Sequence, residues 1–377
     1  MNSSLFNQST LLTIIISALI FVISANPINH LNHKLEWDEV DYVNASKKGF
    51  SSNYFETDTL SFFDFVKLSN LKRLSKDDEL DLFSQNIVEE KEDLFYLRHF
   101  HPPIPIYFWS MFVGESANET DRNIRISSYI FSFFFIVIMT FLIANFSANK
   151  TLNLFQQIFL ISFFTSASFL STNLIINFHS FYSLISILFA YSFIKFIQNE
   201  QLWKLLSFTC ALMLCTLVTS VITLIFAVFF YLLVSKNTLK SIKNVLKIFI
   251  YTIPFLILLW PGVLYSGAIL KTWLMYFYRI FFAGAEEYNN ISLFSSYKEL
   301  ILENPILFLL FLISSIYLIF KIDALSFFKN PFAIIFYLGF LYMIFISVFS
   351  LNLTYFMPAL TMMVFGICLM IGHIKKT

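Results

Sequence analysis

Charged residues and glycine are scarce in this 377-residue chain. Asp, Glu, Lys and Arg together make up 13% of the sequence, about half of the roughly 25% that is usual in soluble domains. The net charge of +1 gives no argument for binding a nucleic acid. Only eight glycines are present and none forms a glycine-rich phosphate loop between a strand and a helix. The composition therefore argues against a soluble nucleotide-dependent enzyme and against nucleic acid as a partner.

Cysteine is scarce too, and its placement excludes two further classes. Cys210, Cys215 and Cys368 all lie within apolar segments, and their spacing is not that of metal ligands. Isolated cysteines in such surroundings usually serve as small core residues. We expect neither a disulfide framework nor a zinc site.

Apolar residues are abundant, at 58% of the chain, and 50 residues are Phe. Apolar runs near or above eighteen residues recur, which is typical of a polytopic α-helical membrane protein. The stretch 202–235 predicts either one long helix or two short ones, so the expected all-α bundle has ten or eleven spans. The expected spans are 5–25, 103–114, 124–145, 153–171, 174–197, 202–218, 219–235, 246–265, 305–321, 330–350 and 353–373.

The first apolar run, Leu11 to Ala25, has two interpretations. It could be a signal peptide cleaved after Ala25, but no Lys or Arg precedes it. The number of later spans favours an uncleaved first transmembrane helix, residues 1–25. A bundle over 105–262, a second polar loop over 263–304 and C-terminal transmembrane helices over 305–377 complete the expected organisation.

The first loop, residues 26–104, is the most polar part of the chain. It holds 15 of the 24 Asp and Glu, nine Lys and Arg, and four of the six His. Apolar and basic residues alternate over 61–74 in a pattern suited to the lipid headgroup region. A further amphipathic helix is predicted to start near Ser75. We therefore expect juxtamembrane helices in a loop that holds the chemistry.

Orientation follows from the lysines in the short loops. Three clusters fall on one side when the spans are counted back from the C-terminus, and the positive-inside rule makes that side the cytoplasm. The loop 263–304 then lies on the opposite face, and 26–104 joins it if 202–235 is a single helix and the N-terminus is cytoplasmic. The clusters are Lys236, Lys240, Lys243 and Lys247; Lys321 and Lys329; Lys375 and Lys376.

Two groups of polar residues stand at the two ends of the 26–104 loop. Asp38 and Glu39 follow Trp37 near the expected membrane surface, where a raised carboxyl pKa suits a general base. Together with Asp41 they could also supply oxygen ligands to a divalent cation, although we expect no metal. Solvated acidic pairs are common in loops, so the pair alone is a weak signal.

At the other end of the loop, Arg98, His99 and His101 precede Pro102-Pro103. Two successive prolines stiffen the chain, and three cationic donors held at headgroup level suit the phosphate of a lipid. The alternative is that these residues only snorkel at a helix end.

The order of these motifs resembles the integral-membrane glycosyltransferases that use polyprenyl-phosphate sugars. This group, with its GT-C fold, includes the protein O-mannosyltransferases, the lipid A aminoarabinose transferases and related lipopolysaccharide sugar transferases. One departure is Thr354, where the family pattern has an arginine. The resemblance rests on Trp37-Asp38-Glu39-Val40-Asp41-Tyr42, on His101-Pro102-Pro103-Ile104-Pro105-Ile106-Tyr107-Phe108-Trp109, on Phe112-Val113-Gly114 followed by Arg122 or Arg125, on Phe178-His179-Ser180-Phe181-Tyr182-Ser183-Leu184, and on Tyr355-Phe356-Met357-Pro358-Ala359-Leu360.

The resemblance implies an inverting sugar transfer to a hydroxyl of a lipid, glycan or protein acceptor. Asp38 would be the base, supported by Glu39, and we expect Arg98, His99 and His101 to contact the donor phosphate. The enzyme would lie in a bacterial inner or plasma membrane with its site on the extracytoplasmic face, and would need no cofactor. Expected cavity residues are Asp41, Tyr42, Tyr107, His179 and Tyr182; weaker candidates in the second loop are Lys271, Arg279, Glu286 and Glu287.

Three other functions remain open from the sequence. A transporter or flippase of lipid-linked saccharides usually carries ionisable residues inside its spans, and acids are nearly absent from the spans expected here. A polysaccharide ligase or polymerase typically uses a large late loop, whereas 263–304 is smaller and less polar than 26–104. A non-catalytic envelope scaffold should tolerate replacement of Asp38.

Overall fold

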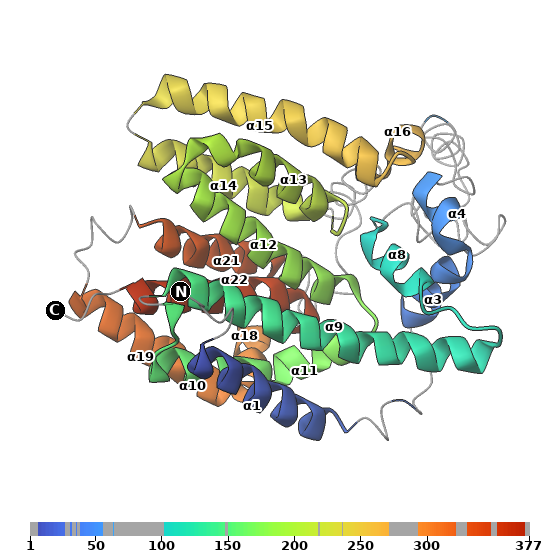
Figure 1. Cartoon of the computed structure of the whole chain (residues 1–377), viewed down its shortest axis with the longest axis horizontal. Helices are drawn as coiled ribbons and strands as arrows, with labels where there is room; N and C mark the ends of the chain where they lie inside the picture. Colours follow the sequence, from blue (N-terminus) through green and yellow to red (C-terminus); the bar gives the residue numbers. More distant parts are fainter. Residues whose placement is uncertain are drawn as a thin grey trace.

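The computed structural model is an all-α membrane protein (Figure 1). It describes residues 7–26, 31, 35, 38–55, 63, 102–147, 150–217, 219–235, 237–270, 293–321, 330–347 and 353–373. In these ranges the regular elements are all helices.

Five of the described helices are long and apolar enough to cross a membrane, and two bent pairs raise the number to seven if each pair is one span. The pair α10 (Leu154–Phe164) and α11 (Ala167–Leu174) bends by 49°, and the pair α18 (Leu293–Glu303) and α19 (Pro305–Lys321) by 100°. The five are α1 (Gln8–Ala25), α9 (Ala117–Phe146), α12 (Phe178–Gln198), α15 (Thr238–Leu259) and α22 (Leu353–His373).

Three shorter helices complete the bundle. The stretch 202–235 forms two helices, α13 (Trp203–Leu214) and α14 (Ser220–Val234), which settles the alternative that the sequence left open. The third is α21 (Pro331–Ser347). Their 12 to 17 residues are fewer than the roughly 20 that usually span a bilayer. The described residues thus hold five to seven candidate spans besides these three shorter helices. The expected number of ten belonged to a single helix over 202–235, which the structure does not show.

The expected span at 103–114 is wrong. The helix there, α8 (Ile104–Ser110), has seven residues, which at 1.5 Å each is about 10 Å, a third of the hydrocarbon thickness. The backbone nitrogen of Ile104 donates to the carbonyl oxygen of Cys215 at the end of α13. The apolar residues of α8 thus pack across the end of the bundle, beside α3 (Asp38–Lys47) and α4 (Gly49–Phe55).

The centre of the bundle is the pair α21 and α22. Gly366 lies so close to α21 that a Cβ there would stand 2.7 Å from the Phe336 nitrogen. Gly339 approaches the Ala359 carbonyl in the same way. Small residues allow this backbone contact in membrane helices. Helix α1 packs at the edge, where Phe21 meets Phe169 edge-on.

The two ends of the bundle differ in charge. We call one the lysine end, because six described lysines gather there. The Lys240 ammonium pairs with Glu200, Lys195 lies over the Phe146 ring and Lys247 over the Trp203 ring, so the ends of α9 and α12 meet the beginnings of α13 and α15. The six are Lys150, Lys195, Lys204, Lys240, Lys243 and Lys247.

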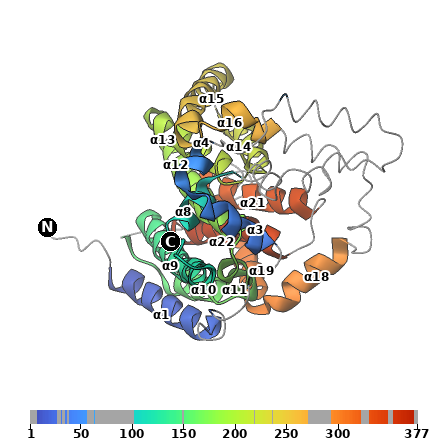
Figure 2. The ribbon, with the colours of Figure 1, turned by 90° about the vertical axis from the view of Figure 1, so that its right-hand side faces the viewer.

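The opposite end, the loop end, carries α3, α4, α8 and α16 (Val263–Ser266). Figure 1 shows these short helices together at the right, and Figure 2 looks onto them. The 30 residues of α9 make about 45 Å of helix, longer than a bilayer core, so its first turns reach this end beside α3 (Figure 1). Ser116 caps that start by accepting a hydrogen bond from the Glu119 nitrogen.

Candidate active site at the loop end

A buried ion pair joins α3 to α9. One terminal nitrogen of Arg125, Nη2, lies 3.1 Å from Oε2 of Glu39, and Nη1 lies 3.4 Å from Oε1. The two side chains are only 3% and 10% exposed, respectively. Two parallel contacts of this kind fix direction as well as distance. The pair therefore holds the beginning of α3 in one orientation on α9.

Glu39 also satisfies the backbone between α11 and α12. The Ile176 nitrogen donates to Glu39 Oε1 over 3.0 Å. Asn177 caps α12 by accepting a hydrogen bond from the Ser180 nitrogen. Ile176 therefore lies in the extended link just before the cap, and its backbone nitrogen has no partner within a helix. Both carboxylate oxygens of Glu39 are thus engaged, which suits a positioning residue better than a proton acceptor.

An aromatic cluster packs beside this pair. The ring of Tyr42, one helical turn beyond Glu39, stacks on Trp109 of α8 with centroids 5.6 Å apart. It also meets Phe178 of α12 edge-on at 4.7 Å. Tyr42 and Trp109 are buried. Offset and edge contacts of this type stabilise a fold by about 0.5–1.5 kcal/mol per pair beyond the effect of burial. Tyr42 therefore helps to hold α3 against α8 and α12.

His179 and Tyr355 bring the two later motifs together. Their rings lie 4.1 Å apart, at the beginnings of α12 and α22, and His179 is buried. One turn deeper, the hydroxyl of Tyr182 shares a 2.7 Å hydrogen bond with that of Thr223 on α14. His179 thus lies closer to the loop end, whereas Tyr182 is a buried interhelical contact.

Tyr107 ties the short helices to α15. Its hydroxyl donates to the Leu259 carbonyl over 3.2 Å, and the hydroxyl of Tyr54 donates to Leu258 over 2.6 Å. Phe50 packs against both tyrosine rings. Two adjacent carbonyls at the end of α15, which lack helical partners, are thereby satisfied. Tyr107 joins α8 to the bundle.

The remaining predicted residues are described incompletely or not at all. Asp38 is the first residue of α3, and acids in a first turn are favoured by the helix dipole. The side chains of Asp38 and Asp41 lie outside the described part of the structure. The phosphate candidates Arg98, His99 and His101 lie outside the described residues, as do Trp37, Lys271, Arg279, Glu286 and Glu287.

Metal ligands do not cluster in the part of the chain that the structure describes, where no three of His, Cys, Asp and Glu come together. The carboxylates of Asp38 and Asp41 lie outside that described part. Among the described residues, the buried contacts between the motif segments at this end involve the Glu39 carboxylate, the Arg125 guanidinium, the His179 ring and several other aromatic rings.

Sequence reasoning missed two features. The Ile176 nitrogen is a backbone donor, and nothing in the residue types marks it as the partner of an acid. The second is a row of hydroxyls at the beginning of α14: Thr219 bonds to the Tyr342 hydroxyl over 3.0 Å, and Thr223 bonds to Tyr182. Thr219 and Thr223 are four residues apart, which places both hydroxyls on one face of a helix. This spacing within the apolar stretch 202–235 could have indicated a polar contact between helices.

Comparison with known proteins gives no match. No protein-family model matches the chain, and no curated protein or solved structure matches it either.

Proposed function

We propose that this chain is an integral-membrane glycosyltransferase that moves a sugar from a polyprenyl-phosphate donor to an acceptor hydroxyl at the loop end. The proposal is supported by the meeting of the motif segments at the loop end. Parts of all five motif segments meet at one end of the bundle: Glu39 contacts Arg125, Tyr42 contacts Trp109 and Phe178, and His179 contacts Tyr355.

The reaction needs a base beside an acceptor hydroxyl. The acceptor oxygen attacks the anomeric carbon, the bond from that carbon to the phosphate oxygen breaks, and the configuration inverts. The acceptor proton passes to a carboxylate, for which we propose Asp38, and the polyprenyl phosphate leaves as the anion. A positioned base contributes roughly 10²–10⁴-fold.

Glu39 supports Asp38 by holding the helix from which it projects. Because the Glu39 oxygens accept from Arg125 and Ile176, the first turn of α3 is fixed against α9 and the α11–α12 link. Catalytic groups held by hydrogen-bonded neighbours react more efficiently than loose ones. For binding the leaving phosphate we propose Arg98, His99 and His101, because of their charge and their place before Pro102.

Charge supports the orientation. The lysine end carries six described lysines, so by the positive-inside rule we assign that end to the cytoplasm and the loop end to the extracytoplasmic face. The acid-rich segment lies in the sequence between α4 and α8, two helices of the loop end. Bacterial inner or plasma membrane is our proposed location. Donor and acceptor would then meet where no nucleotide sugar is available, consistent with a lipid-linked donor.

Sugar transfer by the purified protein tests the proposal. The protein is reconstituted in lipid with radiolabelled polyprenyl-phosphate sugars and a membrane extract as acceptor, beside Asp38→Asn and, as a control of the same chemistry, Asp121→Asn on α9. We expect transfer by the wild type and by Asp121→Asn, and a loss of about 10²-fold or more in Asp38→Asn, with donor binding retained. Equal transfer by all three would remove Asp38 as the base. No transfer and no donor binding by the wild type would refute the proposal and favour a scaffold or a transporter.

A further inference from the structure

Two lysine side chains meet at one aromatic ring where α13 packs against α15 at the lysine end. The Lys247 ammonium lies 3.9 Å from the centroid of the Trp203 ring, and the Lys204 ammonium lies 5.5 Å from the same centroid. Both lysines are exposed. The two nitrogens are no further apart than the sum of these distances. Because lysine stems are flexible, one small anion can contact both ammoniums at once.

Contacts between the two helices hold this ring in place. Tyr251, four residues after Lys247, stands on the same face of α15, and its ring centroid lies 4.4 Å from that of Trp203. One turn further along α13, the Ser207 hydroxyl donates to the Ile248 carbonyl of α15 over 3.2 Å. Trp203 is thus fixed between α13 and α15, and the lysines that meet at it remain open to the surface.

No described residue neutralises the charge of these two lysines. Glu200, the acid closest to Trp203 in the sequence, is engaged with Lys240 over 2.6 Å. Among the described residues, neither Lys204 nor Lys247 forms an ion pair. A cation–π contact attracts an ammonium to a ring but leaves its charge in place. Two uncompensated cations at one ring therefore favour the binding of an anion.

The site stands at the boundary between lipid headgroups and hydrocarbon. The polar residues 198–201 directly precede Trp203, whereas α15 exposes the apolar side chains of Phe249 and Ile250 just beyond Lys247. Tryptophan and tyrosine favour this boundary, and lysine stems lie along apolar surface while the ammonium reaches the headgroups. Helix α15 runs along the edge of the bundle (Figure 1). The anions that meet such a surface are those of phospholipid headgroups.

We propose that Lys204 and Lys247, gathered at the Trp203 ring, bind the phosphate of one anionic phospholipid in the leaflet at the lysine end. The headgroup lies at the two ammoniums, and the acyl chains lie along the exposed apolar side chains of α15. This lipid is a component of the bilayer and not the donor of the proposed sugar transfer, so the proposal does not depend on that reaction.

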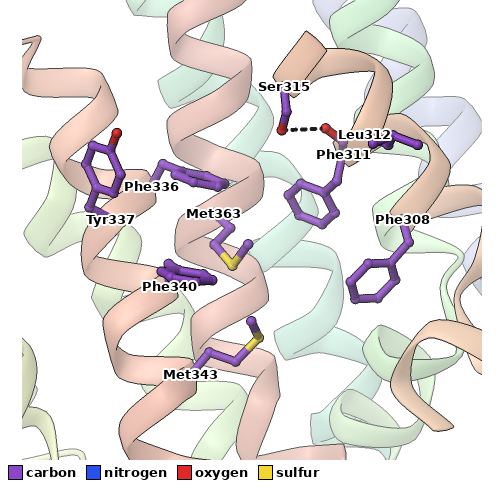
Figure 3. A pocket seen from close by; sticks show the side chains of 9 residues that line it. All are labelled: Phe308, Phe311, Leu312, Ser315, Phe336, Tyr337, Phe340, Met343 and Met363. Atoms are coloured by element: carbon purple, nitrogen blue, oxygen red, sulfur yellow. Dashed lines mark hydrogen bonds between the residues drawn. The ribbon is translucent and has the colours of Figure 1, made fainter. Parts of the chain in front are cut away.

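A cavity on the other side of the bundle provides the contrast. Figure 3 shows it between α19, α21 and α22, about 360 Å³ in volume, with Met343 and Met363 pointing into it. Its lining includes the exposed side chains of Leu312 and Phe340. None of its lining side chains is charged. A lipid chain held there would be retained regardless of the charge of its headgroup.

Lipid retention tests the proposal. The full chain is equilibrated with vesicles of equal phosphatidylglycerol and phosphatidylcholine with the same acyl chains, then extracted into detergent, and its bound lipids are counted by native mass spectrometry. We expect one phosphatidylglycerol retained in preference to phosphatidylcholine. Lys204→Gln with Lys247→Gln should weaken this retention roughly 30-fold, about fivefold for each lysine. Lys204→Arg with Lys247→Arg keeps both charges and should retain the lipid.

The control removes the same charge from the same end of the bundle. Lys150→Gln with Lys195→Gln takes away two other lysines of the lysine end. Lys195 lies 4.8 Å from the centroid of the Phe146 ring, where no second lysine ammonium meets it among the described residues. Retention should therefore be unchanged. An equal loss in the two double variants would show that overall positive charge holds the lipid, and would overturn the proposal.

A competition with inorganic phosphate identifies the source of the anion. Sodium phosphate and sodium chloride at equal ionic strength should lower phosphatidylglycerol retention equally, because both only screen the charges. Displacement by phosphate alone would indicate a site for a free anion and overturn the proposal, as would equal retention of phosphatidylcholine. Asp38→Asn should retain the lipid, so failure of the sugar-transfer proposal is distinguishable.

Discussion

Arg125 and Glu39 lie 3.1 Å apart at the loop end, although 86 residues separate them in the chain. Each stands in a different motif segment, and each belongs to a helix that the other holds in place. The contact is almost fully enclosed, with 3% of the Arg125 side chain exposed. Enclosed pairs depend on both partners, because either one alone is a buried charge without compensation.

The first prediction concerns that pair. Arg125→Met should lower the free energy of unfolding by about 3–5 kcal/mol, because it leaves the Glu39 carboxylate buried without its cation. Glu39→Met together with Arg125→Met should cost much less than the sum of the single changes, because no buried charge remains. The Ile176 nitrogen then lacks its acceptor, which should cost about 1–3 kcal/mol. Denaturant unfolding of the four proteins in one detergent gives the coupling energy.

The control for this cycle is Arg122→Met, an exposed arginine three residues earlier on α9. It should stay within about 0.5 kcal/mol of the wild type. Additive costs in the cycle would show that Glu39 and Arg125 do not support one another, and the role proposed for Glu39 in holding α3 would then be withdrawn.

The second prediction concerns the hydroxyls that tie the short helices to α15. Tyr54→Phe and Tyr107→Phe each remove one donor to the last carbonyls of α15. Each change should cost about 0.5–1.5 kcal/mol of stability, with Tyr54 toward the lower value because its bond is exposed. The thermal midpoint in detergent measures the effect. Tyr265→Phe, an exposed tyrosine of α16, is the control, and an equal loss there would contradict the assignment.

Sequence reasoning reached the class of the fold and part of the site, and its failures have physical causes. Apolar content predicts membrane helices but not breaks, so 202–235 stayed ambiguous until the turn before Ser220 showed two helices. Likewise 103–114 is apolar because α8 packs over the bundle end, not because it spans. Both Arg122 and Arg125 fitted the motif, and only the rotation of α9 distinguishes them, because it buries Arg125 and leaves Arg122 exposed.

The third prediction concerns the contact between α21 and α22. Gly366→Ala places a methyl 2.7 Å from the Phe336 nitrogen and 3.0 Å from the Phe332 carbonyl. Backbone atoms cannot rotate away, so the two helices must separate. We expect a loss of about 1–3 kcal/mol, measured by thermal unfolding. Gly114→Ala is the control, since its methyl would meet the Glu119 side chain, which can move. An equal or larger loss there would contradict the packing argument.

The last prediction is a pH dependence at the lysine end. The hydrogen bond from Lys240 lowers the pKa of Glu200 below its ordinary value of 4.5, against a smaller opposing effect of desolvation. Because the folded-state pKa is the lower one, the stabilisation is fully present above about pH 4.5 and is lost as the pH falls through the folded-state value.

Replacing Glu200 should remove this dependence. Glu200→Gln should unfold more easily than the wild type at pH 7. The difference should shrink as the pH falls from about 4.5 through the lower folded-state pKa, because the wild-type carboxylate is then protonated too. Unfolding midpoints at a series of pH values between 7 and 3 measure it. Because the pair is exposed, the effect at pH 7 should be small and should weaken further in high salt. Adding Lys240→Gln to Glu200→Gln should change little, since the first substitution has already broken the pair. A difference between wild type and Glu200→Gln that grows toward acid would reverse the sign and contradict the 2.6 Å contact as its cause.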